Sequence, residues 1–369
     1  MAKRLLPFHI GITALLFAAF ALGRRDDGVG LQLPWSPSQE ALLVDRLPSV
    51  VASALITHRR MFNLSQMADS QAKAPPPPIP PAYDARLEWG KRCPSLWHID
   101  EQGECNGCWA MVAVTVLADR FCIAAARRMQ RANSSENWAQ YRLYSNLSFS
   151  AMDVLSCCRR ESQGCSGGRP YWAWDYLTRK GAVLDVCKPY TFSPCLHGPP
   201  AEAVDLRLCT ARPDTLQVPP CNHTPSQRLD GQCHRRFKST KLPDVINGGE
   251  EAIQRALLAH GPLEVGMELY RSLYNFTLNI SSRVRRQCLS CEVYRTLVAD
   301  RGWRNFVGGH TVKLLGWGEV ADAAGSPLKY WIVANSWGVH WGDQGFFKIA
   351  RGVMECGIER LAVAGIPLL

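Results

Sequence analysis

The segment Gln-Gly-Glu-Cys-Asn-Gly-Cys-Trp-Ala at residues 102–110 places a thiol, Cys108, directly before an apolar stretch. Apolar side chains recur at helical spacing from Trp109 to Phe121, which predicts a helix from Cys108 to about Met129. The positive end of a helix favours anions, so a thiol at the first helical residue loses its proton more readily. Because the thiolate is a nucleophile and the thiol is not, this segment indicates nucleophilic catalysis.

A thiol nucleophile requires a base that takes its proton and a third group that orients the base. His310 follows two glycines and opens an apolar run, so it is the candidate base. Asn335 lies in Ala-Asn-Ser-Trp-Gly, and its amide oxygen can accept the imidazole N–H. Gln102 and the backbone N–H of Cys108 are candidate donors to an oxyanion. Taken singly, each side chain has an ordinary alternative, because most histidines lie in surface or packing positions and most such asparagines lie in turns.

The composition narrows the class of protein. The chain has 369 residues and 15 cysteines, which indicates an oxidising compartment and several disulfides. The odd count leaves at least one thiol without an intramolecular partner, and Cys108 is the candidate. The net charge is +10, but the basic residues lie in scattered pairs such as Arg127-Arg128, and no basic stripe interleaves with aromatic residues. We therefore expect a solvated basic surface and no nucleic-acid partner.

The N-terminus has the pattern of a secretory signal. Lys3 and Arg4 precede an apolar run from Leu5 to Leu22, so we assign residues 1–23 to a signal peptide. An uncleaved anchor is the alternative, because the run is nearly long enough to span a membrane. We expect no later stretch to be long and apolar enough to cross a bilayer, and therefore no stable membrane insertion after signal removal. The expected destination is an acidic lysosome- or endosome-like compartment or the extracellular space. Six sequons for N-glycosylation agree with passage through the lumen: Asn63, Asn133, Asn146, Asn222, Asn275 and Asn279.

Residues 24–80 are a predicted pro-segment that ends in a proline-rich linker. The run from Ala74 to Pro81 is almost entirely proline, which favours a stiff extended spacer. Residues 81–369 have the patterns of a globular domain. Helical patterns dominate residues 81–245 and strand patterns dominate residues 246–369, which predicts an α+β fold with two lobes.

Local patterns predict the elements that position the candidate residues. Residues 185–245 are rich in proline and cysteine, so we expect long loops held by disulfides there. A Ser-x-x-Asp capping pattern opens the helix at Ser150. The expected elements are helices at residues 150–157, 171–180 and 250–260, and strands at residues 263–269, 311–317, 330–333 and 346–349.

Three sequence blocks resemble the papain-like cysteine peptidases, and they occur in that family's order. They are Gln102-Gly103-x-Cys105-x-x-Cys108-Trp109-Ala110, Gly309-His310 and Asn335-Ser336-Trp337-Gly338. The resemblance is closer to the cathepsin B-like branch, and it covers about residues 80–369. The segments that carry this closer likeness include Tyr83-Asp84-Ala85-Arg86, Cys187-Lys188-Pro189-Tyr190, Trp341-Gly342-Asp343 and Cys356-Gly357-Ile358-Glu359.

The resemblance implies a fold, a reaction and a set of partners. The fold has a helical left lobe and a β-barrel-like right lobe, with the active site in the cleft between them. Cys108 would attack a peptide carbonyl, His310 would protonate the leaving amine and Asn335 would orient His310. Gln102 and the backbone amide of Cys108 would bind the oxyanion. The implied partners are peptide and protein substrates and cystatin-like inhibitors, with no cofactor, no metal and a monomeric chain.

The same resemblance assigns the walls of the cleft. Gly167 and Gly168 resemble the wall that hydrogen-bonds the substrate backbone, and Gly309 leaves room for substrate beside the imidazole. Trp341 resembles the wall on the leaving-group side. Carried over from the family, Cys105 pairs with Cys165, Cys93 pairs with Cys122, and Cys356 is a free thiol. The partner of Cys158 and the roles of Cys288 and Cys291 are left open.

Two departures from the cathepsin B pattern bear on specificity. The region at about 187–233 resembles the occluding loop, in which two adjacent histidines grip the C-terminal carboxylate of a substrate. Only His197 matches, and Gly198 stands at the second position, so we predict mainly endopeptidase activity. His223 or His234 is an alternative second histidine. Leu361 stands where cathepsin B has a glutamate that accepts arginine, so we predict an apolar S2 pocket, formed with Pro170 and Ala173, that prefers Phe or Leu at P2.

Other functions remain open from the sequence alone. Cys105-x-x-Cys108 and Cys288-x-x-Cys291 have the spacing of zinc ligands. A catalytically impaired binding or matrix protein of cathepsin B-like type is the second alternative, because Asn106 departs from the small residues usual before the nucleophile and the pro-segment is short and unfamiliar. A redox role for Cys105-x-x-Cys108 lacks a thioredoxin-like βαβ pattern.

Overall fold

The computed structural model describes residues 77–369 except 133, 160–163, 198–207, 210–214, 223–232, 241–243, 247–248, 275, 277–291, 297–300, 303 and 323. The predicted signal peptide, the pro-segment as far as residue 76 and the Cys288-x-x-Cys291 pair lie outside the described residues. Residues 78–369 form one compact unit.

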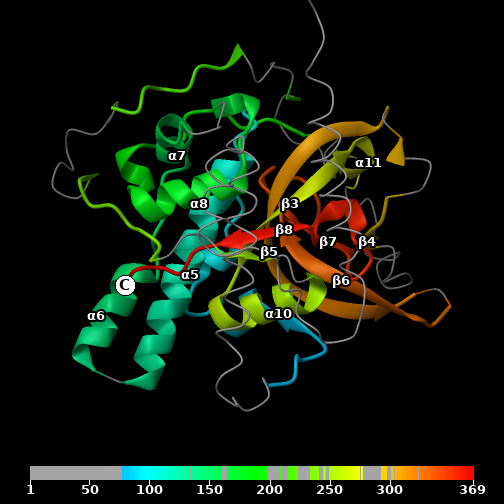
Figure 1. Cartoon of the computed structure of the whole chain (residues 1–369), viewed down its shortest axis with the longest axis horizontal. Coiled ribbons are helices and arrows are strands. Elements are labelled where there is room, and N and C mark those ends of the chain that lie inside the picture. Colours follow the sequence, from blue (N-terminus) through cyan, green and yellow to red (C-terminus); the bar gives the residue numbers. More distant parts are fainter. Residues whose placement is uncertain are drawn as a thin grey trace, which may run out of the picture. The chain divides into compact units, whose positions relative to one another are not determined.

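Helix α5 (Cys108–Arg131) is the central element of this unit, with the helices of residues 135–179 to one side and the sheet to the other (Figure 1). It confirms the helix predicted from Cys108. By length and composition α5 is apolar enough to cross a membrane, but 89% of its most apolar window is buried inside the fold. The expectation that no later stretch has this property was wrong, because a helix that packs on all sides is apolar on all sides.

Helices α7 and α8 pack on α5 in the first half of the domain. The Ser150 hydroxyl accepts a hydrogen bond from the Asp153 backbone N–H at 2.8 Å and caps α7, as the sequence predicts. Helix α6 was not predicted, because Tyr144 is its one buried residue and its apolar pattern is weak. The helices are α4 (Ala85–Trp89), α6 (Ser135–Tyr144), α7 (Ala151–Cys157), α8 (Pro170–Arg179), α10 (Gly249–His260) and α11 (Arg271–Tyr274).

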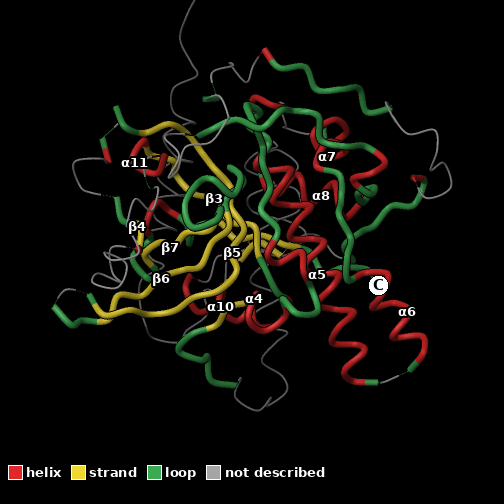
Figure 2. The backbone as a smooth tube through the Cα atoms, turned by 180° about the vertical axis from the view of Figure 1, so that it is seen from behind, coloured by secondary structure: helices red, strands yellow, loops and turns green. Residues whose placement is uncertain are grey.

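The second half of the domain supplies most of one sheet, with strand order β2-β8-β3-β5-β6-β7-β4 and β1 also paired to β5 (Figure 2). The pairs are antiparallel except β4 with β7. Strand β5 is longer than the predicted 311–317, because Gly308 and Gly309 continue its pairing with β3. The strands are β1 (Tyr83–Asp84), β2 (Asp244–Ile246), β3 (Leu263–Tyr270), β4 (Val293–Tyr294), β5 (Phe306–Ala321), β6 (Pro327–Ala334), β7 (Phe346–Ala350) and β8 (Leu361–Ala364).

Polar side chains of α5 join the helices to the sheet. Asp119 of α5 lies 3.1 Å from Nζ of Lys313 on β5, and both side chains are buried. Arg120 donates to the carbonyl oxygens of Pro262 at 2.7 Å and Gly365 at 3.0 Å. Helices α6, α7 and α8 thus lie on the side of α5 opposite to the sheet, and the combination of helices with a largely antiparallel sheet confirms the predicted α+β class.

Disulfides fix the loops around the helical half. The pairs Cys93–Cys122 and Cys105–Cys165 are confirmed. Cys108 and Cys356 carry free thiols, also as predicted. The described part of residues 185–245 is largely loop, as expected, and disulfides hold it. The other pairs among the described residues are Cys157–Cys221, Cys187–Cys233 and Cys195–Cys209.

Candidate active site

Cys108 is the first residue of α5, with Gly107 at the N-cap. The preceding turn is held by the Cys105–Cys165 disulfide and by the Asn106 backbone N–H, which donates to the Cys165 carbonyl oxygen at 3.0 Å. Cys108 itself is buried. The sulfur therefore has a fixed position at the positive end of the helix.

His310 and Asn335 come together because β5 and β6 are neighbours in the sheet. Nε2 of His310 lies 2.8 Å from Oδ1 of Asn335, and both residues are buried. The Ser336 backbone N–H donates to the same oxygen at 2.8 Å, which keeps the amide oxygen turned toward the imidazole. Trp337 covers this pair, with its ring 5.0 Å from that of His310. With Nε2 engaged by Asn335, Nδ1 is the nitrogen that remains for Cys108.

Cys108 and His310 change each other's proton affinity. Burial alone would raise the pKa of the Cys108 thiol, but the charge of His310, its hydrogen bond and the adjacent Thr311 lower it to about 7. Burial would lower the pKa of His310, but Cys108 and the hydrogen bond to Asn335 raise it. Both shifts favour a thiolate beside an imidazolium. The structure thus brings together the predicted nucleophile, base and orienting group.

Gln102 lies in the same site, between the turn before α5 and the residues after β6. Its Nε2 donates to the Cys105 carbonyl oxygen at 2.9 Å, and its Oε1 accepts from the Ser336 hydroxyl at 2.7 Å. Tyr190 donates to the Gln102 carbonyl oxygen at 2.8 Å. Because an amide nitrogen carries two protons, one N–H of Gln102 remains after the bond to Cys105.

Comparison with known proteins now identifies the family. Residues 79–366 match the family model described as papain family cysteine protease. The chain belongs to the papain family of cysteine proteases. It is therefore a cysteine-type peptidase with the two-lobed papain-like fold that its sequence predicts, and it belongs to the cathepsin B-like group of that family.

Individual relatives agree with this assignment. Cathepsin B-like cysteine proteinase 6 of Caenorhabditis elegans is 35% identical over 309 residues, 79% of this chain and 67% of the relative. Cathepsin B-like cysteine proteinase of Schistosoma japonicum is 29% identical over 78% of this chain and 73% of the relative. Among solved structures, proCathepsin B S9 from Trypanosoma congolense has a TM-score of 0.58 and 28% identity, with 79% of each chain covered.

The predicted backbone-binding wall of the peptidase lies beside the indole of Trp109. A Cβ at Gly168 would lie 2.5 Å from that indole, so only glycine fits there. Gly167 has φ of +116° and open space where a side chain would be. Pro170 begins α8 and is buried, and Ala173 is fully buried in the core.

Trp337, which stacks on His310, is the centre of an aromatic cluster. The ring of Tyr274 lies 4.9 Å from that of Trp337 at 6°, and the ring of His197 lies 5.1 Å away at 13°. Trp341 meets Trp337 edge-on at 5.1 Å. Trp341 and His197 therefore both contact Trp337, the residue that covers the imidazole of His310.

The imidazole of His197 is uncharged at neutral pH. Its Nε2 lies 3.9 Å from Oε1 of Glu101 and is buried without a hydrogen-bond partner among the described residues. Burial and the nearby His310 lower the pKa of His197 to about 4, while burial raises the pKa of Glu101 to about 7. The contact is therefore not an ion pair at neutral pH. Gly198 and His223 lie outside the described residues, and His234 is exposed.

Leu361 begins β8 and is half-buried. It pairs with Gly266 of β3, whose missing side chain leaves Leu361 Cδ2 3.5 Å from the position of a Cβ. Glu264, two residues earlier on the same face of β3, is fully buried and accepts a hydrogen bond from Trp174 Nε1 at 2.8 Å. Burial raises the pKa of Glu264 well above the ordinary carboxyl value, so this carboxyl is neutral.

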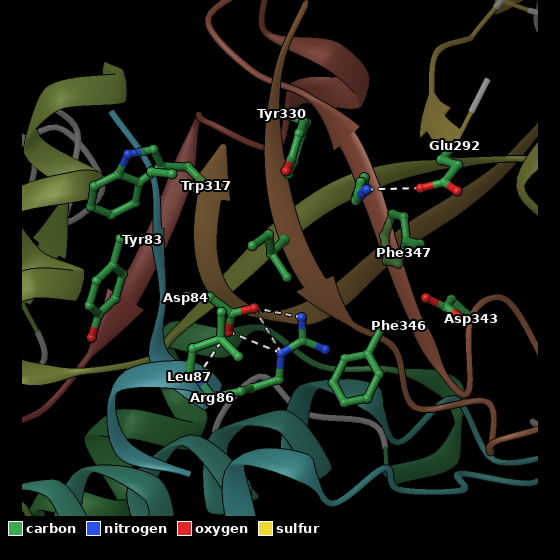
Figure 3. A pocket seen from close by; sticks show the side chains of 13 residues that line it. Tyr83, Asp84, Arg86, Leu87, Glu292, Trp317, Tyr330, Asp343, Phe346 and Phe347 are labelled. Atoms are coloured by element: carbon green, nitrogen blue, oxygen red, sulfur yellow. Dashed lines mark hydrogen bonds and ion pairs between the residues drawn. The ribbon is translucent and has the colours of Figure 1, made fainter. Parts of the chain in front are cut away.

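A cavity of about 350 Å³ lies elsewhere, between β1, α4 and the strands β6 and β7 (Figure 3). Its charged groups are paired within the fold, because Arg86 donates to Asp84 at 2.7 Å and Lys348 to Glu292 at 2.9 Å. None of the predicted site residues lines this cavity. It is therefore separate from the candidate active site.

The alternative of a zinc site is overturned at Cys105, whose sulfur is bonded to that of Cys165. Among the residues that the structure describes, Cys195, His197 and Cys209 also lie close enough for metal binding. The sulfurs of Cys195 and Cys209 form a disulfide, so this group does not ligate a metal.

Three site residues were not singled out from the sequence. Thr311 directly follows His310, so its hydroxyl next to a candidate base is the local signal that could have found it. Glu101 directly precedes Gln102 in the same way. Tyr274 had no local signal, because its stacking on Trp337 arises only when α11 packs against the segment after β6.

Proposed function

We propose that this peptidase cleaves peptide bonds through Cys108, His310 and Asn335. The proton of the Cys108 thiol passes to Nδ1 of His310, and the thiolate attacks the scissile carbonyl carbon. The oxyanion that forms accepts hydrogen bonds from the Cys108 backbone N–H and from the remaining N–H of Gln102. His310 then gives its proton to the leaving amine, and water, activated by the neutral imidazole, hydrolyses the thioester and restores the thiol.

The hydrogen bond of 2.8 Å between His310 Nε2 and Asn335 Oδ1 carries this proposal. It holds the imidazole in the orientation in which Nδ1 points to the sulfur. The direction of both pKa shifts, downward at Cys108 and upward at His310, agrees with it. A catalytically impaired binding protein would not need this arrangement.

Cleavage of a peptide library by wild type and by Cys108→Ala tests the proposal. We expect the variant to lose all measurable hydrolysis and all labelling by an active-site-directed epoxide. Cys356→Ser is the matched control, because it removes a buried free thiol other than Cys108, one that lies beside Thr296. Hydrolysis by Cys108→Ala at the wild-type rate, or a folded wild type that neither cleaves nor labels, would overturn the proposal and leave the binding-protein alternative.

Endopeptidase activity predominates in the proposed function. Carboxylate anchoring requires a charged or hydrogen-bonding pair, whereas His197 is neutral at physiological pH and Gly198 has no side chain to offer. We expect a peptide with an amidated C-terminus to be cleaved within about threefold of the same peptide with a free carboxylate, since no full ion pair is at stake. Measurement of kcat/KM for the matched peptides decides this, and a strong preference for the free acid would contradict it.

Residues 24–80 act as a pro-segment of this peptidase and residues 81–369 as its catalytic domain. This division is supported by the proline-rich run before β1 and by the likeness to a structure titled as a procathepsin B. The signal pattern, sequons and disulfides support passage through the secretory pathway to an acidic compartment or outside the cell. Sequencing the N-terminus of the secreted, active protein tests the boundary.

A further inference from the structure

Thr311 is the residue after His310 on β5, and its side chain points to the face of the sheet that packs on α5. In antiparallel strands directly opposite residues share a face, and alternate residues along a strand do as well. Thr311 is opposite Gly266 and shares its face with Lys313, which reaches Asp119 of α5 at 3.1 Å. Cys108 is the first residue of the same helix.

The hydroxyl of Thr311 is buried, and its Oγ1 makes no hydrogen bond of acceptable length and angle with any described residue. A buried hydroxyl without a partner costs free energy, so its retention requires a reason. Across the sheet Gly266 offers no side chain to it. The group that it can serve is the Cys108 thiol, because the hydroxyl and the backbone N–H of Thr311 are both among the causes that lower the pKa of that thiol.

The protonation state of the Cys108 sulfur explains why the Thr311 hydroxyl has no hydrogen-bond partner. A neutral thiol is a weak acceptor, whereas a thiolate accepts strongly. We propose that Thr311 is a positioning residue of the nucleophile, whose Oγ1–H donates to Cys108 Sγ once the thiol proton has moved to His310. The hydroxyl keeps its own proton, so the step is one proton transfer from sulfur to Nδ1. The inference rests on the proposed function and adds to it a group that acts in the thiolate state alone.

A hydrogen bond made only to the charged form shifts the equilibrium toward that form. Thr311→Val replaces the hydroxyl by a methyl group of the same shape, and Thr311→Ser keeps the hydroxyl. In the full chain we would follow alkylation of Cys108 by iodoacetamide against pH, with mass spectrometry of the peptide that contains Cys108. We expect the midpoint of the acid limb to rise by about one pH unit in Thr311→Val, and so a roughly tenfold slower reaction below the midpoint. Thr311→Ser should keep the wild-type midpoint.

An unchanged midpoint in Thr311→Val, or an equal rise in Thr311→Ser, would overturn the inference, since the hydroxyl would then not matter. Thr311→Ala is the second variant if Thr311→Val does not fold, and the same rise is expected because Ala also lacks the hydroxyl. The alkylation requires no peptide hydrolysis. A rise in midpoint together with a wild type that cleaves no peptide would therefore sink the proposed function alone, and cleavage without the rise would sink this inference alone.

Discussion

At the sulfur of Cys108, burial and charge act in opposite directions. Burial favours the neutral thiol, but the imidazolium of His310 and the positive end of α5 favour the thiolate. His310 faces the converse balance, and Asn335 helps to keep its proton. The chemistry therefore depends on hydrogen bonds to two groups that would both be neutral if they were buried alone.

Removal of the Asn335 amide oxygen should destabilise the protonated form of His310. In Asn335→Ala we expect kcat/KM to fall about 100-fold, a typical share of positioned acid–base catalysis. The alkaline limb of the pH–rate profile should also move to lower pH, because the hydrogen bond that raises the pKa of His310 is gone. Asn335→Asp keeps an acceptor and should hold that limb at or above its wild-type position. An alkaline limb unmoved in Asn335→Ala would contradict the role of Asn335.

Leu361 should decide the P2 preference. Wild type is expected to prefer Phe or Leu at P2, because Leu361 is apolar and the buried carboxyl of Glu264 is neutral. Leu361→Glu should shift the ratio of kcat/KM for Arg over Leu at P2 about tenfold toward Arg, as one partly buried ion pair would. Leu361→Gln, of similar size without charge, is the control. Arg as the best P2 residue in wild type would refute the prediction.

At the residue scale the sequence was most informative where chemistry restricts the residue type. Cys108, His310 and Asn335 could be chosen by type, spacing and family resemblance, and the structure brings them together. Tyr274 and the neutral state of His197 could not, because stacking and burial depend on chain segments far apart in sequence.

At the scale of elements, predictions succeeded where the local pattern and the tertiary environment agree. Helix α7 was found from its Ser150 cap, and α8 within one residue at each end. Strand β1 (Tyr83–Asp84) was missed, because two residues carry no periodicity and the strand exists only by pairing with β5. Helix α6 was missed because it is stabilised by capping more than by burial.

The contact between the backbone-binding wall and α5 should tolerate no added methyl group. In Gly168→Ala a Cβ would meet the indole of Trp109, which is buried and cannot move aside. We expect a loss of about 2 kcal/mol in stability, as overpacking usually costs, together with reduced kcat/KM as the wall shifts. Gly302→Ala is the control, because open space surrounds its Cβ position and its change should stay within about 0.5 kcal/mol. Equal denaturation midpoints for the two variants would contradict this packing argument.

At the scale of the whole molecule, the proposed catalysis requires that two lobes meet in a fixed register. Cys108 belongs to the helical half and His310 to the sheet, so neither lobe alone holds a site. The contact was not predictable from local patterns, which contain no information on how α5 packs against β5. It includes an ion pair, Asp119 with Lys313, whose side chains are both almost fully buried.

Removal of one charge from that pair should destabilise the whole domain. Lys313→Met leaves the Asp119 carboxyl buried without its cation, so we expect a loss of about 3–5 kcal/mol in the free energy of unfolding at neutral pH. The pKa of Asp119 is already raised by burial despite Lys313, and without Lys313 it should rise further. The folded variant then binds more protons than the unfolded chain between the unfolded and folded pKa values, so its deficit should shrink as pH falls through that window. Asp119→Leu combined with Lys313→Met removes both charges and should recover most of the loss, as denaturation measured at pH 5 and 7 can establish. A deficit in Lys313→Met that is equal at both pH values and persists in the double variant would mean that lost packing, and not the buried charge, governs this contact between the lobes.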